Sequence, residues 1–556
     1  MTLVLFLIVI TLLVIAFAEP LGERIGVVAP VILLVVGAAA AYLPQVPEVF
    51  VEPEIILQLI LPPLLFATAM RMPDHDFRRN LSAIFALAVL LVGVTSVCVG
   101  AAIHFLVPEI PLAYAIAVGA VVSPSDAVAV GIVRRAGVNR RIVAVLDGEG
   151  LINDASALVI LGSSLLAARS HVTAGEVAAS FLWAVVGAVL VGYCVGKVAM
   201  LLRRFLHHAS SNTVLSLAIP FAAFLPAEEV GASGLVATVV AGLVVADAAA
   251  RELHPATRIS DNRTWDAVGL ILESLVFVLM GLQMPHLINE ATASGFTFAA
   301  SLWVALAVWV VVLVVRCLAV APLLGFLRRS TVRLRKRSVE DAAGGTSRKR
   351  TVRRLADGAY YAKKPLGVRA GGVIVWAGMR GAVTLAAAQT LPQDTPARGF
   401  LILVAFIVAA VSLVVQGGTL GWVVAVLKPG ADEPSSPEER EWVRKQLDEA
   451  AAGIAVPPSL RHRLVSQGVS PAKVPHATLI DLARAGRELM AESPGEAGGV
   501  WEYAAERVSV QREALVRIRE AGLIDAPDFD RELRIIDGEQ LAVEALARDG
   551  STGALR

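Results

Sequence analysis

The sequence predicts an all-α membrane protein with about thirteen transmembrane helices, and three observations lead to this fold class. Hydrophobic residues make up 56% of the 556 residues, only 17% are charged, and the mean hydropathy is +0.69. A soluble domain is usually about 25% charged. Apolar runs of about 20 residues, the length that a helix needs to cross a bilayer, recur along the chain. Basic residues gather in every second loop between these runs.

Thirteen apolar segments are predicted to span the membrane, and the weakest is 213–228, which is short and contains Pro220. The first ends in Ala16-Phe17-Ala18, which resembles a signal-peptidase site, but no Lys or Arg precedes it, so we expect an uncleaved helix. The segments run over 2–18, 25–43, 54–70, 81–107, 111–133, 142–168, 176–202, 213–228, 231–249, 267–288, 298–326, 370–391 and 399–427.

The charges of the loops predict the orientation in the membrane. Arginines follow the first, third, fifth, seventh, ninth and eleventh segments, whereas the alternate loops carry mostly acidic residues. Loops rich in Lys and Arg stay in the cytoplasm. We therefore expect a multi-pass protein of the inner, cytoplasmic membrane, surrounded by lipid, with its N-terminus outside and its C-terminus in the cytoplasm.

Two hydrophilic pieces accompany the predicted membrane domain of residues 1–427. Residues 328–369 form a basic cytoplasmic loop within it, which we expect to fix the topology, with docking of lipid headgroups or of the tail as the alternative. Residues 428–556 have mixed charges and helical periodicity, which predicts a cytoplasmic helical domain. Lys plus Arg (49) balance Asp plus Glu (48), so the charge indicates no nucleic-acid partner. The three cysteines are far apart, which argues against a cysteine metal site, and no cofactor is expected.

Polar residues in the fifth segment indicate a functional site, because a charge at mid-membrane costs about 2.5–3.5 kcal/mol on insertion scales. Asp126 follows Ser123-Pro124-Ser125. The proline removes a backbone donor and disturbs the helix, and irregular backbone at membrane depth is tolerated where it lines a cavity. We expect Asp126 to face a wetted pocket in which Ser125 supplies a hydroxyl.

The sixth and twelfth segments carry further charges near mid-membrane, and Glu273, Arg316 and Lys197 are additional candidates that lie nearer a polar neighbour or a segment end. Glu149, Asn153 and Asp154 lie within six residues of one another, and Arg380 lies among glycines. An arginine in this position needs a carboxylate partner, so we expect a structural ion pair between Glu149 and Arg380. That pairing would leave Asp126 and Asp154 to bind either a proton or a hard monovalent cation such as Na⁺, which prefers oxygen ligands.

Three motifs in this order resemble those of the monovalent cation:proton antiporter-1 family, the sodium/proton exchangers, and in particular its bacterial branch. They are Ser125-Asp126-Ala127, the residues Gly148 to Asp154, which read GEGLIND, and the residues Gly378 to Ala382, which read GMRGA. The resemblance covers roughly residues 1–427.

The resemblance implies a fold, an activity and roles for the residues above. The fold is thirteen helices in two inverted repeats with two crossed broken helices, a core domain that moves against a dimerisation domain, and a homodimer. The activity is electroneutral exchange of Na⁺ (with K⁺ or Li⁺ as alternatives) for H⁺ by alternating access, which serves pH and cation homeostasis. Cation and proton binding map to Asp126, Asp154, Ser125 and Asn153, Na⁺ being held at Asp126 and Asp154, and the core pair maps to Glu149 and Arg380.

One departure from the family pattern concerns the ion ligands, and two alternatives accompany the functional prediction. Gly150 stands where the family has a serine whose hydroxyl helps to bind the ion. This loss keeps open a non-transporting cation or pH sensor that signals through its tail. An intramembrane aspartyl protease also uses two aspartates, but its Gly-x-Gly-Asp pattern is absent around Asp126 and Asp154. We therefore predict a transporter and no enzyme.

Overall fold

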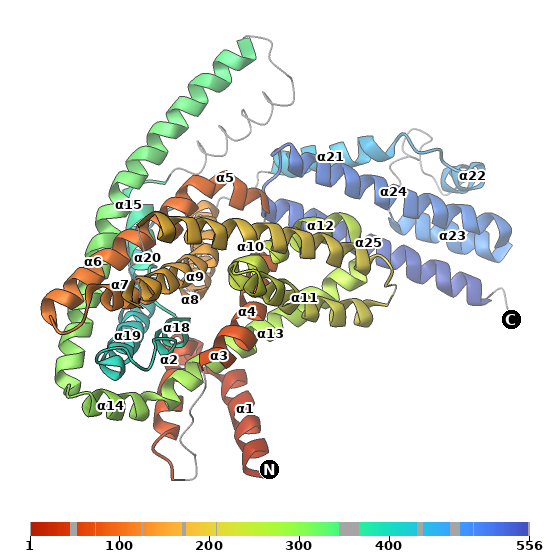
Figure 1. The fold of residues 1–556 in the computed structure, drawn as a ribbon. Helices are drawn as coiled ribbons and strands as arrows, with labels where there is room; N and C mark the ends of the chain where they lie inside the picture. The colour runs from red at the N-terminus through yellow and green to blue at the C-terminus, as the bar shows by residue number, and fades with distance from the viewer. Residues whose placement is uncertain are drawn as a thin grey trace.

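The computed structural model describes residues 2–44, 53–72, 74–123, 127–169, 174–206, 208–343, 366–381, 383–430, 437–466, 479–492 and 494–553. These residues form helices joined by turns, and none of them forms a β-strand. Figure 1 shows a bundle of membrane helices with a second group of helices, formed by the C-terminal part of the chain, beside it.

The helices of the membrane domain follow the predicted apolar segments in order. They are α1 (Thr2–Ile25), α2 (Ala29–Ala40), α3 (Pro53–Ile55), the π-helix η1 (Ile56–Ile60), α4 (Leu61–Arg71), α5 (Asp74–Phe85), the π-helix η2 (Ala86–Leu90), α6 (Leu91–Leu106), α7 (Leu112–Val121), α8 (Ala127–Arg135), α9 (Arg140–Arg169), α10 (Ala174–Arg203), α11 (Ala209–Glu229), α12 (Gly234–Glu252), α13 (Pro255–Leu282), α14 (Met284–Ala293), α15 (Phe298–Ala343), α17 (Val368–Trp376), α18 (Val383–Gln389), α19 (Arg398–Ser412), the π-helix η3 (Leu413–Gly417) and α20 (Gly418–Leu427).

The all-helical membrane fold is confirmed, whereas the count of thirteen spans stays a prediction. Nine helical stretches in the described part of the chain are long and apolar enough to cross a membrane, and three shorter apolar helices accompany them. Each of the thirteen predicted segments lies on at least one helix. Of these three, Ile56–Arg71 includes a π-helix, Leu112–Val121 belongs to an interrupted segment, and Ala29–Ala40 is a short continuous helix. Length and composition alone therefore do not identify them as full spans.

Two of the predicted segments are broken helices. The fifth is divided into α7 and α8, and the twelfth is divided into α17 and α18. The first break contains Pro124, which has no backbone N–H to donate. The second contains Gly378 and Gly381, and glycine destabilises a helix more than any other residue except proline. Helices α18 and α19 both contact α7, so segments far apart in the sequence meet at the breaks.

Apolar packing divides the membrane helices into a large core and a smaller one. The large core includes residues of α6, α7, α9, α15 and α19, whereas the smaller one joins α4 with α10, α11, α12 and α13. In the smaller core Phe66 packs against Trp265 at 4.8 Å between ring centroids, and the indole N–H of Trp265 donates to Ser216 Oγ at 2.8 Å. Gly192 lets α10 approach the backbone of α12 at Ala237, where a side chain would not fit.

The C-terminal helices are α21 (Pro437–Ala451), α22 (Pro458–Ser466), α23 (Leu479–Glu492), α24 (Pro494–Glu520) and α25 (Ala526–Gly553), and they have two small apolar cores of their own. Charged contacts attach them to the membrane domain. The buried carboxylate of Asp537 accepts hydrogen bonds from Arg258 on α13 and, at 2.9 Å, from Arg512 on α24. His254 and Glu544 lie 2.7 Å apart.

The predicted basic loop of residues 328–369 begins as a helix. Helix α15 leaves the bundle and continues to Ala343 (Figure 1). A helix in this position carries the first arginines of the basic segment away from the membrane domain. Residues 344–365 lie outside the described residues.

The partly buried Glu539 on α25 makes the tail sensitive to pH. Burial raises the pKa of Glu539 above its ordinary value of 4.5, Arg507 opposes the rise, and the carboxylates of two neighbouring acids, Asp448 and Glu532, add to it. A pKa raised in the fold means that the fold favours the protonated form. This stabilisation is fully present below about pH 4.5 and is lost as the pH rises through the raised pKa.

Glu539→Gln should therefore stabilise the tail at neutral pH, because the glutamine needs no proton to remain buried. Amide hydrogen exchange of α25 in the full-length protein should be slower in this variant than in the wild type at pH 7, and the difference should disappear below pH 4. The exposed Glu502 on α24 offers a matched control, since Glu502→Gln should leave the pH profile unchanged. Faster exchange in Glu539→Gln at pH 7 would contradict the effect of burial.

Candidate functional site

Arg380 joins the two broken helices to α9. Its guanidinium Nη1 lies 3.0 Å from Asp154 Oδ1, and its Nε donates to the carbonyl of Val121 at 2.7 Å. Nη2 also donates to that carbonyl. Val121 is the last residue of α7, and the last carbonyls of a helix have no partner within the helix. Arg380 thus binds the open end of the first broken helix and a carboxylate of α9 with one side chain.

Side chains of the last membrane segment satisfy the backbone at the second break. Ser412 Oγ accepts a hydrogen bond from the backbone N–H of Arg380 at 2.9 Å. Gln416 Nε2 donates to the carbonyls of Trp376 at 3.0 Å and Gly378 at 3.3 Å. Because no water in the bilayer core satisfies free backbone groups, these contacts allow an interrupted helix at membrane depth.

Glu149 pairs with Arg316, not with Arg380, and the predicted Glu149–Arg380 pair was therefore wrong. Arg316 Nη1 and Nη2 donate to the two carboxylate oxygens of Glu149 at 2.5 and 2.9 Å, and both side chains are at most 2% exposed. Arg316 also donates to the carbonyl of Ile374, near the end of α17, at 3.0 Å from Nε and 2.9 Å from Nη2. Gly378 makes room for this guanidinium, since a side chain there would collide with it.

The ion pair that replaces the predicted one changes the environment of Asp154. The sequence indicated that Asp154 would be left without a basic partner, but Arg380 reaches it because Arg316 occupies the place beside Glu149. The Asp154 side chain is 14% exposed and that of Arg380 is 2% exposed. The carboxylate is therefore the part of this pair that remains accessible.

The structure describes some of the other predicted site residues and leaves others outside its described ranges. Asn153 precedes Asp154 on α9 and is fully buried. Ser125 and Asp126 lie outside the described residues, between Ser123 and Ala127, so their predicted contacts stay predictions. Gly150 lies one turn before Asp154 on α9, and nothing in the described part of the chain lies within 4 Å of the position where a side chain would begin.

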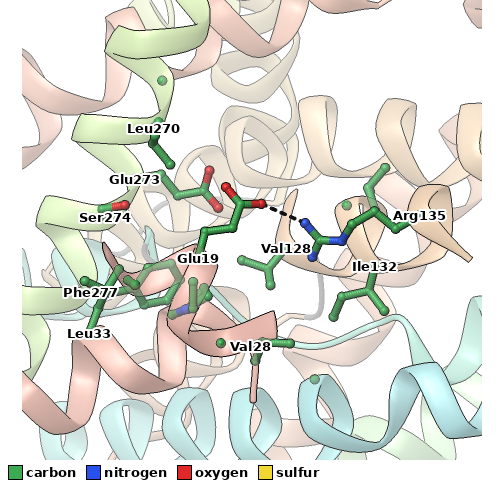
Figure 2. A pocket seen from close by; sticks show the side chains of 18 of the residues that line it. Glu19, Val28, Leu33, Val128, Ile132, Arg135, Leu270, Glu273, Ser274 and Phe277 are labelled. Atoms are coloured by element: carbon green, nitrogen blue, oxygen red, sulfur yellow. Dashed lines mark hydrogen bonds and ion pairs between the residues drawn. The ribbon is translucent and has the colours of Figure 1, made fainter. Parts of the chain in front are cut away.

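A cavity of about 540 Å³ opens between α1, α2, α4, α8, α9, α13 and α20 (Figure 2). Its wall includes Val128 on α8, two residues after Asp126 in the sequence, and Ser274 and Phe277 on α13. Arg135 and Glu19, 3.0 Å apart, bridge α8 and α1 in this cavity. Within the described ranges no group of three or more His, Cys, Asp or Glu residues is arranged to hold a metal ion.

Together these contacts give the site its chemical capacity. The buried guanidinium groups of Arg316 and Arg380 each lie against a carboxylate, which offsets the cost of burying their charge. Glu149 is enclosed and held by two hydrogen bonds, as a structural group requires. Asp154 is accessible and faces the point where both helices are interrupted, as a group that exchanges ligands requires.

Removal of Arg316 should destabilise the protein strongly, because Glu149 would remain as a buried, uncompensated charge. We expect Arg316→Gln to cost about 3–5 kcal/mol, measured from the thermal unfolding of the full-length protein in detergent. The exposed pair of Arg204 and Glu252 provides a control, since Arg204→Gln should cost less than about 1 kcal/mol. The double variant Glu149→Gln/Arg316→Gln should be milder than Arg316→Gln, and a double variant that is worse would disprove the pairing.

Comparisons with known proteins agree with this architecture. Residues 8–426 match the family described as sodium/hydrogen exchanger, transmembrane. The chain is 36% identical over 271 residues to YjcE of Escherichia coli, an uncharacterised Na⁺/H⁺ exchanger. This match covers 47% of this chain and 49% of that protein. It is 33% identical over 297 residues to a sodium, potassium, lithium and rubidium/H⁺ antiporter of Bacillus subtilis. That match covers 51% of this chain and 44% of that protein. The chain thus matches about half the length of these two relatives.

The fold also has a solved counterpart. The sodium proton antiporter MjNhaP1 of Methanocaldococcus jannaschii superposes with a TM-score of 0.56 over 76% of this chain and 99% of that one, at 16% identity. At this identity the superposition establishes the fold alone. The sequence match covers both broken helices, α9 and all the described residues of the site. The chain therefore belongs to the sodium/hydrogen exchanger family.

Proposed function

We propose that this protein exchanges Na⁺ for H⁺ across the cytoplasmic membrane by alternating access. The observation that carries the proposal is the accessible carboxylate of Asp154, held by Arg380 where two interrupted helices meet. A carboxylate in such a place binds a proton or a metal ion at the same oxygens, so the two ligands exclude one another. Membership of the sodium/hydrogen exchanger family supports exchange as the activity.

The ion pair with Arg380 adds a condition to this exchange. Cation binding at Asp154 competes with the guanidinium for the carboxylate, because a carboxylate beside a positive charge attracts a second cation less strongly. Asp126 would supply the second negative charge, with the hydroxyl of Ser125 and the buried Asn153 beside the ion. Arg380 is also fixed by Val121, so it remains near the site when the cation arrives.

The finer properties follow the same proposal. Na⁺ is the first candidate for the cation, and K⁺ and Li⁺ are supported by the name of the Bacillus subtilis relative. One proton per cation follows if Asn153 adds no charge to the site. The loop charges support a cytoplasmic C-terminus, and a homodimer in the lipid membrane is proposed from the family resemblance of the sequence motifs. A non-transporting sensor has no support among the comparisons.

Asp154→Asn should abolish exchange while the protein still inserts, because an amide does not exchange a proton for a cation. Everted membrane vesicles with a pH-sensitive dye should show Na⁺-dependent dequenching for the wild type and none above background for the variant. The exposed Asp247 on α12 gives a matched control, since Asp247→Asn should retain exchange. Normal exchange in Asp154→Asn would refute the proposed site.

Gly150→Ser should tighten cation binding if a hydroxyl is missing from the site. The space at Gly150 accepts a side chain, so the substitution is expected to fold. One added ligand is worth about 1 kcal/mol, which lowers the half-saturating Na⁺ concentration about fivefold in the vesicle assay. Gly150→Ala fills the same space without the hydroxyl and should leave the Na⁺ dependence unchanged. If both variants behave alike, the hydroxyl has no role.

A further inference from the structure

Glu273 is a carboxylate within a membrane helix that has no hydrogen bond or ion pair in the described part of the chain. It lies on α13, in a stretch long and apolar enough to span the membrane. Its side chain is partly buried and lines the 540 Å³ cavity. Figure 2 shows its carboxylate pointing toward that of Glu19, and Arg71 and Glu19 are the charged residues that act on it.

The arginines of the cavity wall are already engaged with other acids. Arg134 lies 2.8 Å from Asp147. Arg135 lies 3.0 Å from Glu19, and the third arginine, Arg71, lies 2.9 Å from Asp266.

Among the described residues of the cavity, these pairs leave two carboxylates without an ion-pair partner, Glu23 and Glu273. Glu23 is exposed, whereas Glu273 is partly buried and lies within the membrane span. The cavity therefore holds a carboxylate within the span that forms no ion pair with the arginines of its wall.

An unpaired carboxylate in this position is costly for the fold in its ionised form. Apolar side chains, including Leu33, Val128 and Phe277, line the cavity around it (Figure 2). An unpaired acid in such surroundings lowers stability, and ionisable residues in membrane spans commonly mark ion pathways. Low-dielectric walls of a cleft also focus the field of a charge and raise the local concentration of counter-ions.

The cavity lies on the side of the membrane that the loop charges assign to the cytoplasm. Arg71, Arg134 and Arg135 end helices α4 and α8 in loops that are predicted to be cytoplasmic. From there the cavity extends to Val128, near the start of α8 and close in sequence to the first break. Glu273 and the start of the second half of the first broken helix thus line the same cavity.

We propose that Glu273 is the access carboxylate of the cytoplasmic pathway, which collects a hydrated monovalent cation and delivers it toward Asp154. The proposal rests on the proposed exchange activity and adds a residue that sets the apparent affinity from one face of the membrane. Asp154 determines whether exchange occurs at all, and Glu273 determines how much cytoplasmic cation is needed.

Glu273→Gln keeps the shape of the side chain and removes its charge, so it separates these two roles. In everted vesicles, where the cytoplasmic face meets the added Na⁺, the half-saturating Na⁺ concentration should rise about tenfold. The maximal rate should stay within about twofold of the wild type, since the binding site itself is intact. In right-side-out vesicles, with Na⁺ added to the other face, the half-saturating concentration should not change.

Two further variants test the explanation by charge and depth. Glu273→Asp retains the carboxylate and should recover most of the wild-type affinity. Glu23→Gln removes the other carboxylate without an ion pair, which is exposed, and should change the half-saturating concentration less than Glu273→Gln. Choline chloride, which screens the charge, should raise the half-saturating Na⁺ concentration of the wild type and have little effect on Glu273→Gln.

The results that overturn the proposal are specific to it. An unchanged half-saturating concentration in Glu273→Gln, or an equal rise from both faces, would exclude a cytoplasmic access role. If Glu273→Gln does not insert, the wild type still provides a test. A half-saturating Na⁺ concentration of the wild type that does not change with choline chloride would also exclude a cytoplasmic access role. Exchange that persists in Asp154→Asn instead overturns the proposed function, whatever the behaviour of Glu273.

Discussion

The architecture of the site depends on one guanidinium group, that of Arg380. It binds the carbonyl at the end of α7 and the carboxylate of Asp154 on α9, while its own backbone N–H is held by Ser412 on α19. A helix interrupted in the membrane exposes carbonyls that lipid does not satisfy, and a buried arginine needs negative partners. Here the free carbonyl at the end of α7 and the buried guanidinium of Arg380 satisfy one another. The interruption is stable because the arginine is present, and the arginine is tolerated because the interruption provides an acceptor.

Arg316 and Glu149 have a complementary task. They form an enclosed pair with two hydrogen bonds, and Arg316 also binds the carbonyl of Ile374 near the end of α17. Each broken segment therefore has an arginine at the carboxyl end of its first half. One arginine is neutralised by an enclosed acid and the other by an accessible acid. This difference separates the group that stabilises the fold from the group that can exchange its ligand.

The sequence allowed the prediction of the helical segments, of both interruptions and of the polar residues near them, because each has a local cause. Apolar length predicts the spans, Pro124 predicts the first break, and the glycines around Arg380 predict the second. The choice of partner for Glu149 has no local cause. Arg316 lies in the middle of an apolar run, which signals a buried charge, but which acid it meets depends on how α15 packs against α9 and on the space left by Gly378.

The pairing of charges also explains why Glu273 differs from the other acids of the membrane domain. Glu149 and Asp154 each face a buried arginine, and Glu19 and Asp147 face arginines at the cavity wall. Glu273 has no such pair among the described residues, and an unpaired carboxylate that is buried in its ionised form lowers stability. Arg71 is near enough to act on Glu273 but is bound to Asp266. Because the arginines around the cavity are bound to other acids, a mobile cation is the partner that we propose for the Glu273 carboxylate.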